Sequence, residues 1–358
     1  MGHRYIGSKE KLSNIIIKEI RIISPKAKTV IDLMAGTGLF SLALRENGYL
    51  VTASDVMTYS FHHLNVLLKQ NSPPSFKRVL VEEKIEISNT TLFQKTNYEL
   101  VLDYLNHLST AKGYFWDEFS PEGNPKDATK TRKYFTANNA AKIDAIRQKV
   151  KEWKSKDWIN EKEHSLLIHD LIMAANNIAN IAGTYGHYLS KFVKRSLDAI
   201  ELMPSQFSKI GSIEGHSIFR GYAEELAPQL KGDICYIDPP YIKRQYAANY
   251  HILETLARED TPKAIGESGL RPWRDQYSNF CSKVKIRQSF HEIFTHMKCD
   301  DFLISYSEDG LLPIDDLIEF FSKYGIVTKK DIEYKRFKSN NNDRSATLTE
   351  FLIHLHRQ

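Results

Sequence analysis

The sequence predicts an α/β fold, a seven-stranded and mostly parallel sheet with a largely helical region inserted into it. Two observations support this prediction. Short apolar runs typical of buried strands alternate with helical patterns, as in sheets that helices cover on both faces. Between residues 82 and 211 the strand pattern stops, and long helical stretches take its place.

The predicted strands are short runs rich in β-branched, aliphatic and aromatic residues. The polar residues 338–344 join the last two strands, so we expect these strands to form a C-terminal antiparallel hairpin. In chain order the predicted strands are Val30–Leu33, Leu50–Ala53, Ser217–Arg220, Ile234–Asp238, Phe302–Tyr306, Ile326–Tyr334 and Thr347–Leu355.

The predicted helices divide the chain into two parts. Apolar residues at helical spacing predict a helix over Leu12–Ile23. Residues 113–132 are rich in Pro, Gly, Asp and Lys and predict a loop, and helices over 138–158 and 161–182 follow it. We therefore expect a discontinuous domain, residues 1–81 and 212–358, interrupted by a mostly helical region, residues 82–211.

The composition fits a globular protein with a mildly basic surface. Of the 358 residues, 42% are hydrophobic and 26% are charged, and the net charge is +5. This charge is compatible with a polyanionic partner but does not identify one. Basic and aromatic residues are mixed in residues 191–195, 243–246 and 334–338. Such stretches either line a groove that neutralises phosphates and stacks bases, or are solvated faces.

The sequence predicts no metal site and no disulfide framework. The cysteines are Cys235, Cys281 and Cys299, an odd number without a CxxC pair. We interpret His62-His63 as a pair on a helix surface, because no matching ligand cluster follows. The chain starts without a signal-peptide pattern and has no run of 18 apolar residues, so we expect a cytoplasmic protein without a membrane segment.

A glycine turn after the first predicted strand predicts a cofactor site. Ala35-Gly36-Thr37-Gly38 follows the strand that carries Asp32, and glycine lets the backbone approach a ligand closely. A nicotinamide fingerprint needs a third glycine at position 41, where this chain has Ser41. The turn therefore favours S-adenosylmethionine, which has no pyrophosphate. Asp55 ends the next strand, where an acid can bind both ribose hydroxyls, and Asp32 can pair with the cationic methionine portion.

A second motif, Asp238-Pro239-Pro240-Tyr241, ends the strand that precedes it. Neither proline can donate to the ladder, so Asp238 and Tyr241 are left at the carboxyl end of the strand, where open α/β sheets bind ligands. The exocyclic amine of adenine is a poor nucleophile, because its lone pair is delocalised into the ring. Asp238 and the carbonyl of Pro239 can accept both amine hydrogens and direct the lone pair at a methyl donor. Tyr241 offers a flat face for a flipped base.

Together these motifs resemble the N6-adenine DNA methyltransferases of the DNA adenine methylase type, in the alpha arrangement. There the cofactor motif comes first, the target-recognition region second and the catalytic tetrad last, as here. The resemblance implies a Rossmann-like seven-stranded methyltransferase sheet, with residues 82–211 as the inserted target-recognition region. A purely structural helical subdomain is the competing interpretation of this insert. Further resemblance lies in residues 134–147, 179–191, 244–255, 305–307 and 334–336.

The resemblance also implies roles at the cofactor site, and Asp238 of the tetrad is among the residues predicted there. Tyr5 and Gly7-Ser8-Lys9 match a segment that folds over the methionine end of the cofactor. Tyr222 stands where the family often has Asp. The contact to the cofactor adenine is therefore left to Tyr222, through its ring and backbone N–H, or to Glu224.

We expect DNA contacts in both parts of the chain. Basic residues next to the tetrad can hold phosphates beside a flipped nucleotide, and a tyrosine there can fill the space that the base leaves. Tyr250 is a candidate for this space, but packing in a helix core suits it equally. In the insert, residues 184–188 either contact DNA or pack as a loop. The residues predicted to bind DNA are Lys243, Arg244, Tyr246, Tyr185, His187, Lys191 and Arg336.

The sequence thus predicts methyl transfer from S-adenosylmethionine to adenine N6 in a specific double-stranded DNA sequence, with base flipping. The enzyme would be the modification half of a restriction–modification system, with a cognate restriction endonuclease as partner. An RNA adenine N6 methyltransferase, such as a ribosomal one, can carry the same tetrad. A catalytically inactive DNA-binding specificity module is the alternative from another class. A protein-glutamine methyltransferase is disfavoured, since that chemistry usually shows Asn in place of Asp238.

Overall fold

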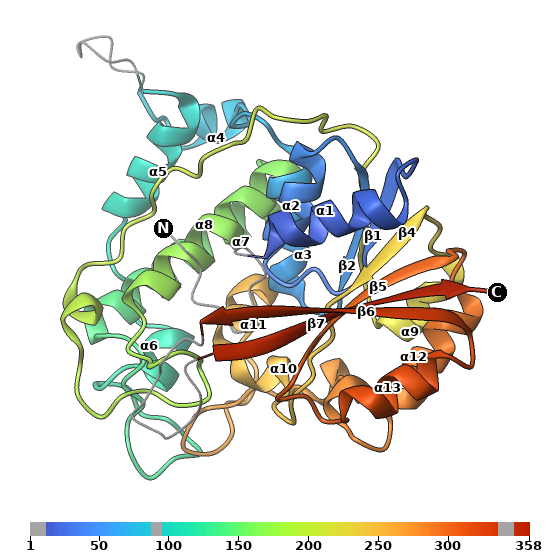
Figure 1. The fold of residues 1–358 in the computed structure, drawn as a ribbon. Helices are drawn as coiled ribbons and strands as arrows, with labels where there is room; N and C mark the ends of the chain where they lie inside the picture. Colours follow the sequence, from blue (N-terminus) through green and yellow to red (C-terminus); the bar gives the residue numbers. More distant parts are fainter. Residues whose placement is uncertain (1–11, 87–94, 336–346) are drawn as a thin grey trace. The chain divides into compact units, whose positions relative to one another are not determined.

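The chain forms two compact units in a computed structural model that describes residues 12–86, 95–335 and 347–358 (Figure 1). As far as the chain is described, the helical unit comprises His62–Lys209 and Ala247–Asp275. The sheet unit comprises residues 12–61, Ile210–Tyr246 and Gln276–Gln358. The predicted assignment of catalysis to residues 1–81 and 212–358 and of target recognition to residues 82–211 stays a prediction.

The sheet unit contains a seven-stranded sheet in the order β3-β2-β1-β4-β5-β7-β6. The neighbouring strands from β3 to β5 pair in parallel, and β7 pairs antiparallel with both β5 and β6. The predicted mixed α/β sheet with its C-terminal hairpin is therefore confirmed. The strands are β1 (Thr29–Asp32), β2 (Leu50–Asp55), β3 (Ser217–Arg220), β4 (Ile234–Ile237), β5 (Asp301–Ser307), β6 (Gly325–Lys335) and β7 (Thr347–Arg357).

The chain reverses its direction of travel across the sheet between β1 and β4. From β1 it moves outward to β2 and β3, and it then returns to pair β4 with the other side of β1. Ligands of open α/β sheets bind outside the carboxyl ends of the strands at such a switch point. Asp32 is the last residue of β1, and Asp238 directly follows β4.

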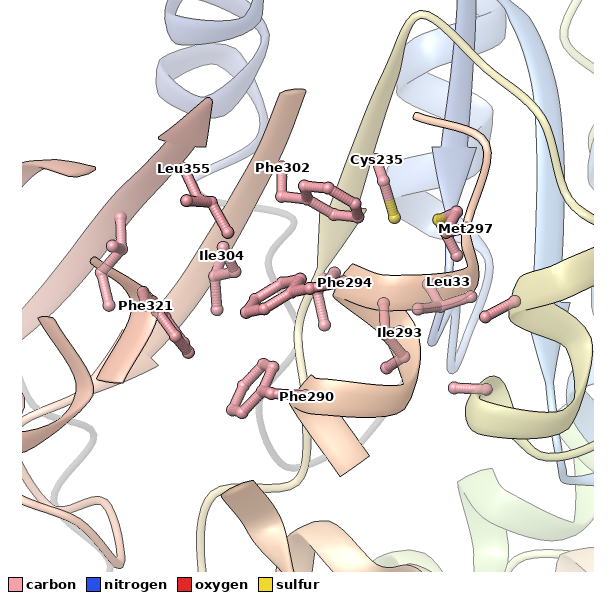
Figure 2. Packing of buried hydrophobic residues seen from close by; sticks show 14 of the residues in the cluster. Leu33, Cys235, Phe290, Ile293, Phe294, Met297, Phe302, Ile304, Phe321 and Leu355 are labelled. Atoms are coloured by element: carbon pink, nitrogen blue, oxygen red, sulfur yellow. The ribbon is translucent and has the colours of Figure 1, made fainter. Parts of the chain in front are cut away.

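Helices cover both faces of the sheet. On one face, α9 (Ala223–Leu226), α12 (Ile286–His296) and α13 (Ile314–Phe321) pack on alternate residues of the strands. In Figure 2, Phe294 of α12 lies beside Ile304 and Phe302 of the sheet, and its ring centroid is 5.0 Å from that of Phe302. On the other face lie α1 (Ser13–Ile23) and α2 (Leu39–Glu46). The ring of Phe40 in α2 lies 4.4 Å from the ring of Tyr236, whose side chain points away from Cys235 and Ile237.

Among the described residues, the helical unit contains helices and isolated bridges but no strand of the sheet. Its helices are α3 (Thr58–Lys69, which begins in the sheet unit), α4 (Lys77–Glu82), α5 (Asn97–His107), α6 (Tyr114–Phe119), α7 (Ala137–Ser155), α8 (Glu161–Ile178), α10 (Tyr246–Asn249, at the unit boundary) and α11 (His251–Arg258). Short 3-10 turns cover Lys194–Leu197, Ala227–Gln229, Arg274–Gln276 and Asn279–Cys281 in the two units.

Two local predictions for the first half of the chain were wrong. The predicted loop 113–132 contains α6, because the carboxylate of Asp144 accepts hydrogen bonds from the main-chain N–H groups of Phe115 and Trp116 and so caps this helix. The predicted surface pair His62-His63 is buried, since residues of α8 cover it: His62 Nδ1 lies 3.1 Å from Ser165 Oγ, and His63 Nδ1 lies 2.7 Å from His169 Nδ1. Among the described residues, no helix combines the length and the apolar composition needed to cross a membrane.

Candidate active site

The glycine turn after β1 has the backbone conformation that its sequence predicts. Gly36 and Gly38 have φ values of 54° and 77°, in the left-handed region where a Cβ atom is unfavourable. The turn is fixed by hydrogen bonds from Ala35 N–H to the carbonyl of Ser54 and from Gly38 N–H to the carbonyl of Ala35, both 2.9 Å. Gly38 then begins α2 as its N-cap residue.

Asp55, at the end of β2, holds this turn in place. Its carboxylate accepts a hydrogen bond from Gly36 N–H at 2.8 Å and another from Met57 N–H at 2.8 Å. The side chain is half-buried, so one carboxylate connects the end of β2 with the glycine turn while it remains accessible. An acid in this position can both shape the turn and bind a hydroxyl group of a ligand.

Asp32 is the most perturbed acid of the site. It is 1% exposed, and Ser41 Oγ of α2 donates a hydrogen bond to it at 2.5 Å. Burial raises the pKa of Asp32 from 3.8 to about 7, against the lowering effect of the Ser41 hydrogen bond, and repulsion from Asp238 and Asp55 adds to the increase. Asp32 and Asp55 end the adjacent parallel strands β1 and β2, and Asp238 follows β4 on the other side of β1, so the three acids share one edge of the sheet. A buried acid that resists ionisation and faces two further acids is a site that favours a cation.

The Asp-Pro-Pro-Tyr tetrad follows β4 without regular secondary structure. Asp238 is half-buried and Pro239 is buried, next to the fully buried Ile237. The ring of Tyr241 packs edge-on against the ring of Tyr306, with 5.8 Å between the ring centroids. The carbonyl of Tyr241 accepts a hydrogen bond from Leu311 N–H at 2.9 Å. Tyr306 of β5 thus fixes the ring of Tyr241, and the loop between β5 and α13 fixes its backbone.

The residues that support the site carry little signal in the sequence. Ser41 stands out there only where a third glycine would be, yet it is the hydrogen-bond partner of Asp32. The hydroxyl of Tyr306 accepts a hydrogen bond from Leu312 N–H at 2.9 Å, and a Cβ atom on Gly310 would lie 2.2 Å from Cε1 of Tyr306. Tyr306 belongs to residues 305–307, which resemble the family, but neither that resemblance nor a glycine shortly after a strand identifies the ring that Gly310 accommodates.

Tyr222 and Glu224 lie at the start of α9, after β3. Tyr222 is the half-buried N-cap residue of this helix. Ser289 Oγ of α12 donates a hydrogen bond to a carboxylate oxygen of Glu224, so Glu224 connects two helices. Tyr222 remains the predicted contact to a cofactor adenine, and Glu224 serves packing in this conformation.

The segment after the tetrad directs basic side chains outward. Lys243 and Arg244 are exposed, and Tyr246 is half-buried at the start of α10. Between them, the buried Gln245 donates to the carbonyl of Ser278 at 3.0 Å and accepts from Ser278 N–H at 2.8 Å. This pair of hydrogen bonds anchors the backbone while the flanking cations remain on the surface.

The predicted DNA-binding residues of the helical unit differ in exposure. His187 and Lys191 are exposed, and His187 Nδ1 lies 3.0 Å from Ser268 Oγ. Tyr185 is 0% exposed and donates its hydroxyl to Asn176 Oδ1 at 3.0 Å. Its ring is a core residue in this conformation, which corrects the expectation of a DNA contact there. Tyr250 is likewise 0% exposed, in agreement with the packing alternative.

The remaining predicted residues lie outside the described part of the chain. These are Tyr5, Gly7, Ser8 and Lys9, predicted at the cofactor, and Arg336, predicted at DNA. Their roles stay predictions.

Comparisons with known proteins show the family of the chain. Residues 5–320 match the family described as D12 class N6 adenine-specific DNA methyltransferases. The chain is 31% identical to modification methylase StsI of Streptococcus sanguinis, covering 99% of this chain and 52% of that protein. It is 31% identical to type II methyltransferase M.NlaIII of Neisseria lactamica, covering 97% of both chains. It is 30% identical to type II methyltransferase M.FokI of Planomicrobium okeanokoites, covering 99% of this chain and 52% of that protein.

The chain therefore spans about half of the StsI and FokI methylases and nearly all of the NlaIII methylase. Among solved structures, TehB from Haemophilus influenzae is similar at a TM-score of 0.37 and 9% identity, covering 96% of this chain and 62% of that one. The family match covers most of the sequence and includes both the glycine turn and the tetrad. The chain belongs to the D12 class of N6 adenine-specific DNA methyltransferases, the family that its glycine turn and Asp-Pro-Pro-Tyr motif predict.

Proposed function

We propose that this chain transfers a methyl group from S-adenosylmethionine to the N6 amine of adenine in one specific double-stranded DNA sequence. Its role is that of the modification enzyme of a restriction–modification system, paired with a cognate restriction endonuclease. One observation supports the proposal: Asp32, Asp55 and Asp238 lie at the carboxyl ends of adjacent strands, beside a glycine turn that has positive φ angles and is bonded to Asp55. The enzyme family supplies the reaction class.

The residues at the glycine turn suit S-adenosylmethionine, which carries a sulfonium and an ammonium cation. The buried carboxyl of Asp32, whose pKa is about 7, gains a partner when a cation approaches it. Gly36 and Gly38 allow close approach of the ligand to the backbone. Asp55 is assigned to the ribose hydroxyls, and Tyr222 to the adenine ring of the cofactor. When bound, S-adenosylmethionine supplies the electrophilic methyl group.

Asp238 and Pro239 are assigned to the amine of the target adenine. The carboxylate of Asp238 and the carbonyl of Pro239 each accept one amine hydrogen, which draws the nitrogen toward tetrahedral geometry and exposes its lone pair. As positive charge develops on the nitrogen, the carboxylate of Asp238 stabilises it and accepts a proton or passes it to water. The ring of Tyr241, braced by Tyr306, stacks on the flipped base, a contact that contributes about 1–3 kcal/mol.

Lys243 and Arg244 are assigned to phosphates next to the flipped nucleotide, because both are exposed immediately after the tetrad. The side chain of Tyr246 is assigned to the space that the base leaves. In the helical unit, the exposed His187 and Lys191 are the remaining candidates for DNA contact. Target recognition is assigned to residues 82–211.

Incubation of the purified chain with S-adenosylmethionine and unmodified plasmid DNA tests this proposal, with N6-methyladenine located by single-molecule sequencing. We expect modification at every copy of one short sequence and none elsewhere. Ribosomal RNA in a parallel reaction should accept no methyl group. Methylation of RNA but not DNA would contradict the proposed substrate, and a chain that binds no S-adenosylmethionine would contradict the proposed enzyme.

A further inference from the structure

Two histidines and an aspartate meet at the end of the sheet opposite the candidate active site. Asp301 is the first residue of β5, and His356 is its direct partner on the antiparallel β7. His354 lies two residues earlier on β7, so its side chain shares the face of His356. β5 is parallel to β4, so Asp301 lies at the amino ends of the strands, whereas Asp32 and Asp238 lie at their carboxyl ends.

The side chains of the three residues converge on one point. Asp301 Oδ1 lies 2.8 Å from His354 Nε2 and 2.9 Å from His356 Nδ1. One ligand atom from each of the three residues lies within 4.8 Å of the others. The side chains of His354 and Asp301 are 19% and 18% exposed, and that of His356 is 50% exposed, so the site opens to solvent on one side.

We propose that Asp301, His354 and His356 form a site for a divalent transition-metal ion, and we assign zinc as the ion. Two imidazole nitrogens and one carboxylate oxygen are a three-ligand set that zinc accepts, with water in the fourth tetrahedral position. Bonds of about 2.0–2.2 Å in tetrahedral geometry place ligand atoms about 3.3 Å apart. The separations of Asp301 Oδ1 from the two histidine nitrogens, 2.8 and 2.9 Å, need to widen by a few tenths of an ångström, and the two nitrogens lie within 4.8 Å of each other. Both histidines ligate as neutral imidazoles.

The surroundings of the site are consistent with an exposed metal ion. Asp301 and His356 line a surface cavity of about 590 Å³, which leaves room for a water ligand. The wall carries charges of both signs, with Lys26, Lys231 and Lys298 opposed by Asp233 and Asp300. Exposure to solvent screens the lysine charges.

Two further side chains of the cavity wall, Arg357 and Cys299, form hydrogen bonds with other groups and are not proposed as ligands. Arg357 pairs with Asp300 at 3.1 Å and donates to the carbonyls of Phe294 and Met297. The buried Cys299 donates its thiol to the main-chain carbonyl of Asp301, so the ligand set contains no thiolate.

A metal ion here would act as a structural clasp. It would connect the last residues of β7, which carry His354 and His356, with Asp301 at the start of β5. Because the site lies at the opposite ends of the strands from Asp32 and Asp238, zinc would raise thermal stability without entering the methyl-transfer site.

The test uses the full chain without a histidine tag, freed of metal by a chelator and then titrated with zinc chloride by calorimetry. We expect one zinc ion per chain and a higher melting temperature. Cobalt(II) in its place should give the intense visible bands of tetrahedral coordination. His356→Ala and Asp301→Asn should each bind zinc at least about a hundredfold more weakly, since loss of merely a supporting group costs about 10–100-fold.

His296→Ala is the matched control, because His296 pairs with Glu292 at 3.3 Å on α12 and forms only a two-residue set. This variant should bind zinc as the parent chain does. Absence of stoichiometric zinc would overturn the proposal. Unchanged zinc binding in His356→Ala would overturn it too, because the three residues would then form hydrogen bonds only.

Discussion

At the scale of single residues, the site depends on one carboxyl group that burial keeps partly protonated. Asp32 has a pKa of about 7 because desolvation raises it, with repulsion from Asp238 and Asp55 as the smaller causes. A cation that binds beside Asp32 stabilises the ionised carboxylate and so lowers the pKa of Asp32. Ligand binding and proton release are therefore linked.

The first prediction concerns the pH dependence of cofactor binding. With a pKa of about 7, Asp32 is roughly one-tenth ionised at pH 6 and nine-tenths ionised at pH 8. The affinity for S-adenosylmethionine should rise about tenfold over this range, with uptake of the ligand releasing a proton. Calorimetry in buffers of different ionisation enthalpy measures both quantities. In Asp32→Asn the affinity should be low and independent of pH.

Ionisation of Asp32 has the opposite effect on folding: a higher pH favours cofactor binding but lowers the free energy of unfolding. Its pKa in the folded chain lies above the value of 3.8 of an unperturbed carboxyl, so the folded state binds more protons between pH 4 and 7. The contribution of Asp32 to stability therefore falls as pH rises through this window. Asp32→Asn should raise the melting temperature at pH 8 and have less effect at pH 5. An equal shift at both pH values would contradict the assigned ionisation.

The second prediction separates a ligand-binding acid from a structural one. Asp55→Asn should weaken S-adenosylmethionine binding about tenfold or more, the scale expected for hydrogen bonds to a charged group. Asp233→Asn is the control, because Asp233 accepts hydrogen bonds from Lys28 N–H and from both the N–H and the hydroxyl of Thr29, at the amino ends of the strands. It should lower stability slightly and leave the dissociation constant unchanged. If both variants weakened S-adenosylmethionine binding equally, the proposed contact of Asp55 with the ribose hydroxyls would be contradicted.

At the scale of elements, the end of β5 and the loop that leads to α13 hold the ring of Tyr241, which we propose stacks on the target base. Tyr306 at the end of β5 supports Tyr241, and Leu311 and Leu312 attach the loop to the two tyrosines. Burial raises the pKa of the Tyr306 hydroxyl, so this group remains a neutral hydrogen-bonding partner.

The third prediction tests this support. Gly310→Ala introduces a Cβ atom 2.2 Å from Cε1 of Tyr306, so the ring or the loop must move. We expect a loss of about 1–3 kcal/mol in the free energy of unfolding, as for overpacking. Methylation should fall more than cofactor binding. Gly183→Ala, where nothing lies within 4 Å, should be neutral in chemical denaturation. Full methylation by a folded Gly310→Ala chain would show that Tyr241 needs no support from this loop.

Elements were predictable to different degrees. The strands follow from short apolar runs, and all seven predicted strands overlap β1 to β7. α6 was not predictable, because it is short and its cap, Asp144, comes from a helix later in the chain. The same reason applies to the buried His63, whose partner His169 is 106 residues away. Periodicity reports the face of an element, but not which distant residue covers it.

At the scale of the whole molecule, a modest net charge of +5 must support binding to a polyanion. Location therefore matters more than the total charge, and the exposed Lys243 and Arg244 directly follow the tetrad. The family and its reaction were predictable, because the glycine turn and the tetrad each require particular residue types in sequence. The burial of Tyr185 was not, because its partner Asn176 and the neighbouring ring of Tyr134 are set by packing of the helical unit.

The fourth prediction concerns salt dependence. Lys243→Gln combined with Arg244→Gln should weaken DNA binding for all sequences and reduce the slope of log affinity against log salt by about 2. Lys18→Gln combined with Lys323→Gln removes the same charge from two other exposed positions and should change the slope little. Fluorescence anisotropy over a range of salt concentrations measures both. Equal slopes for the two double variants would exclude a phosphate role for the segment after the tetrad.

The central claim is that Asp238 activates the adenine amine and is not needed to hold the DNA. Single-turnover methylation by Asp238→Ala, with DNA and S-adenosylmethionine affinities measured on the same preparation, tests it most directly. We expect the methylation rate to fall by about a hundredfold or more, as when one group that stabilises developing charge is removed, while DNA binding is largely retained. A variant that still methylates at a substantial fraction of the parent rate would contradict this mechanism.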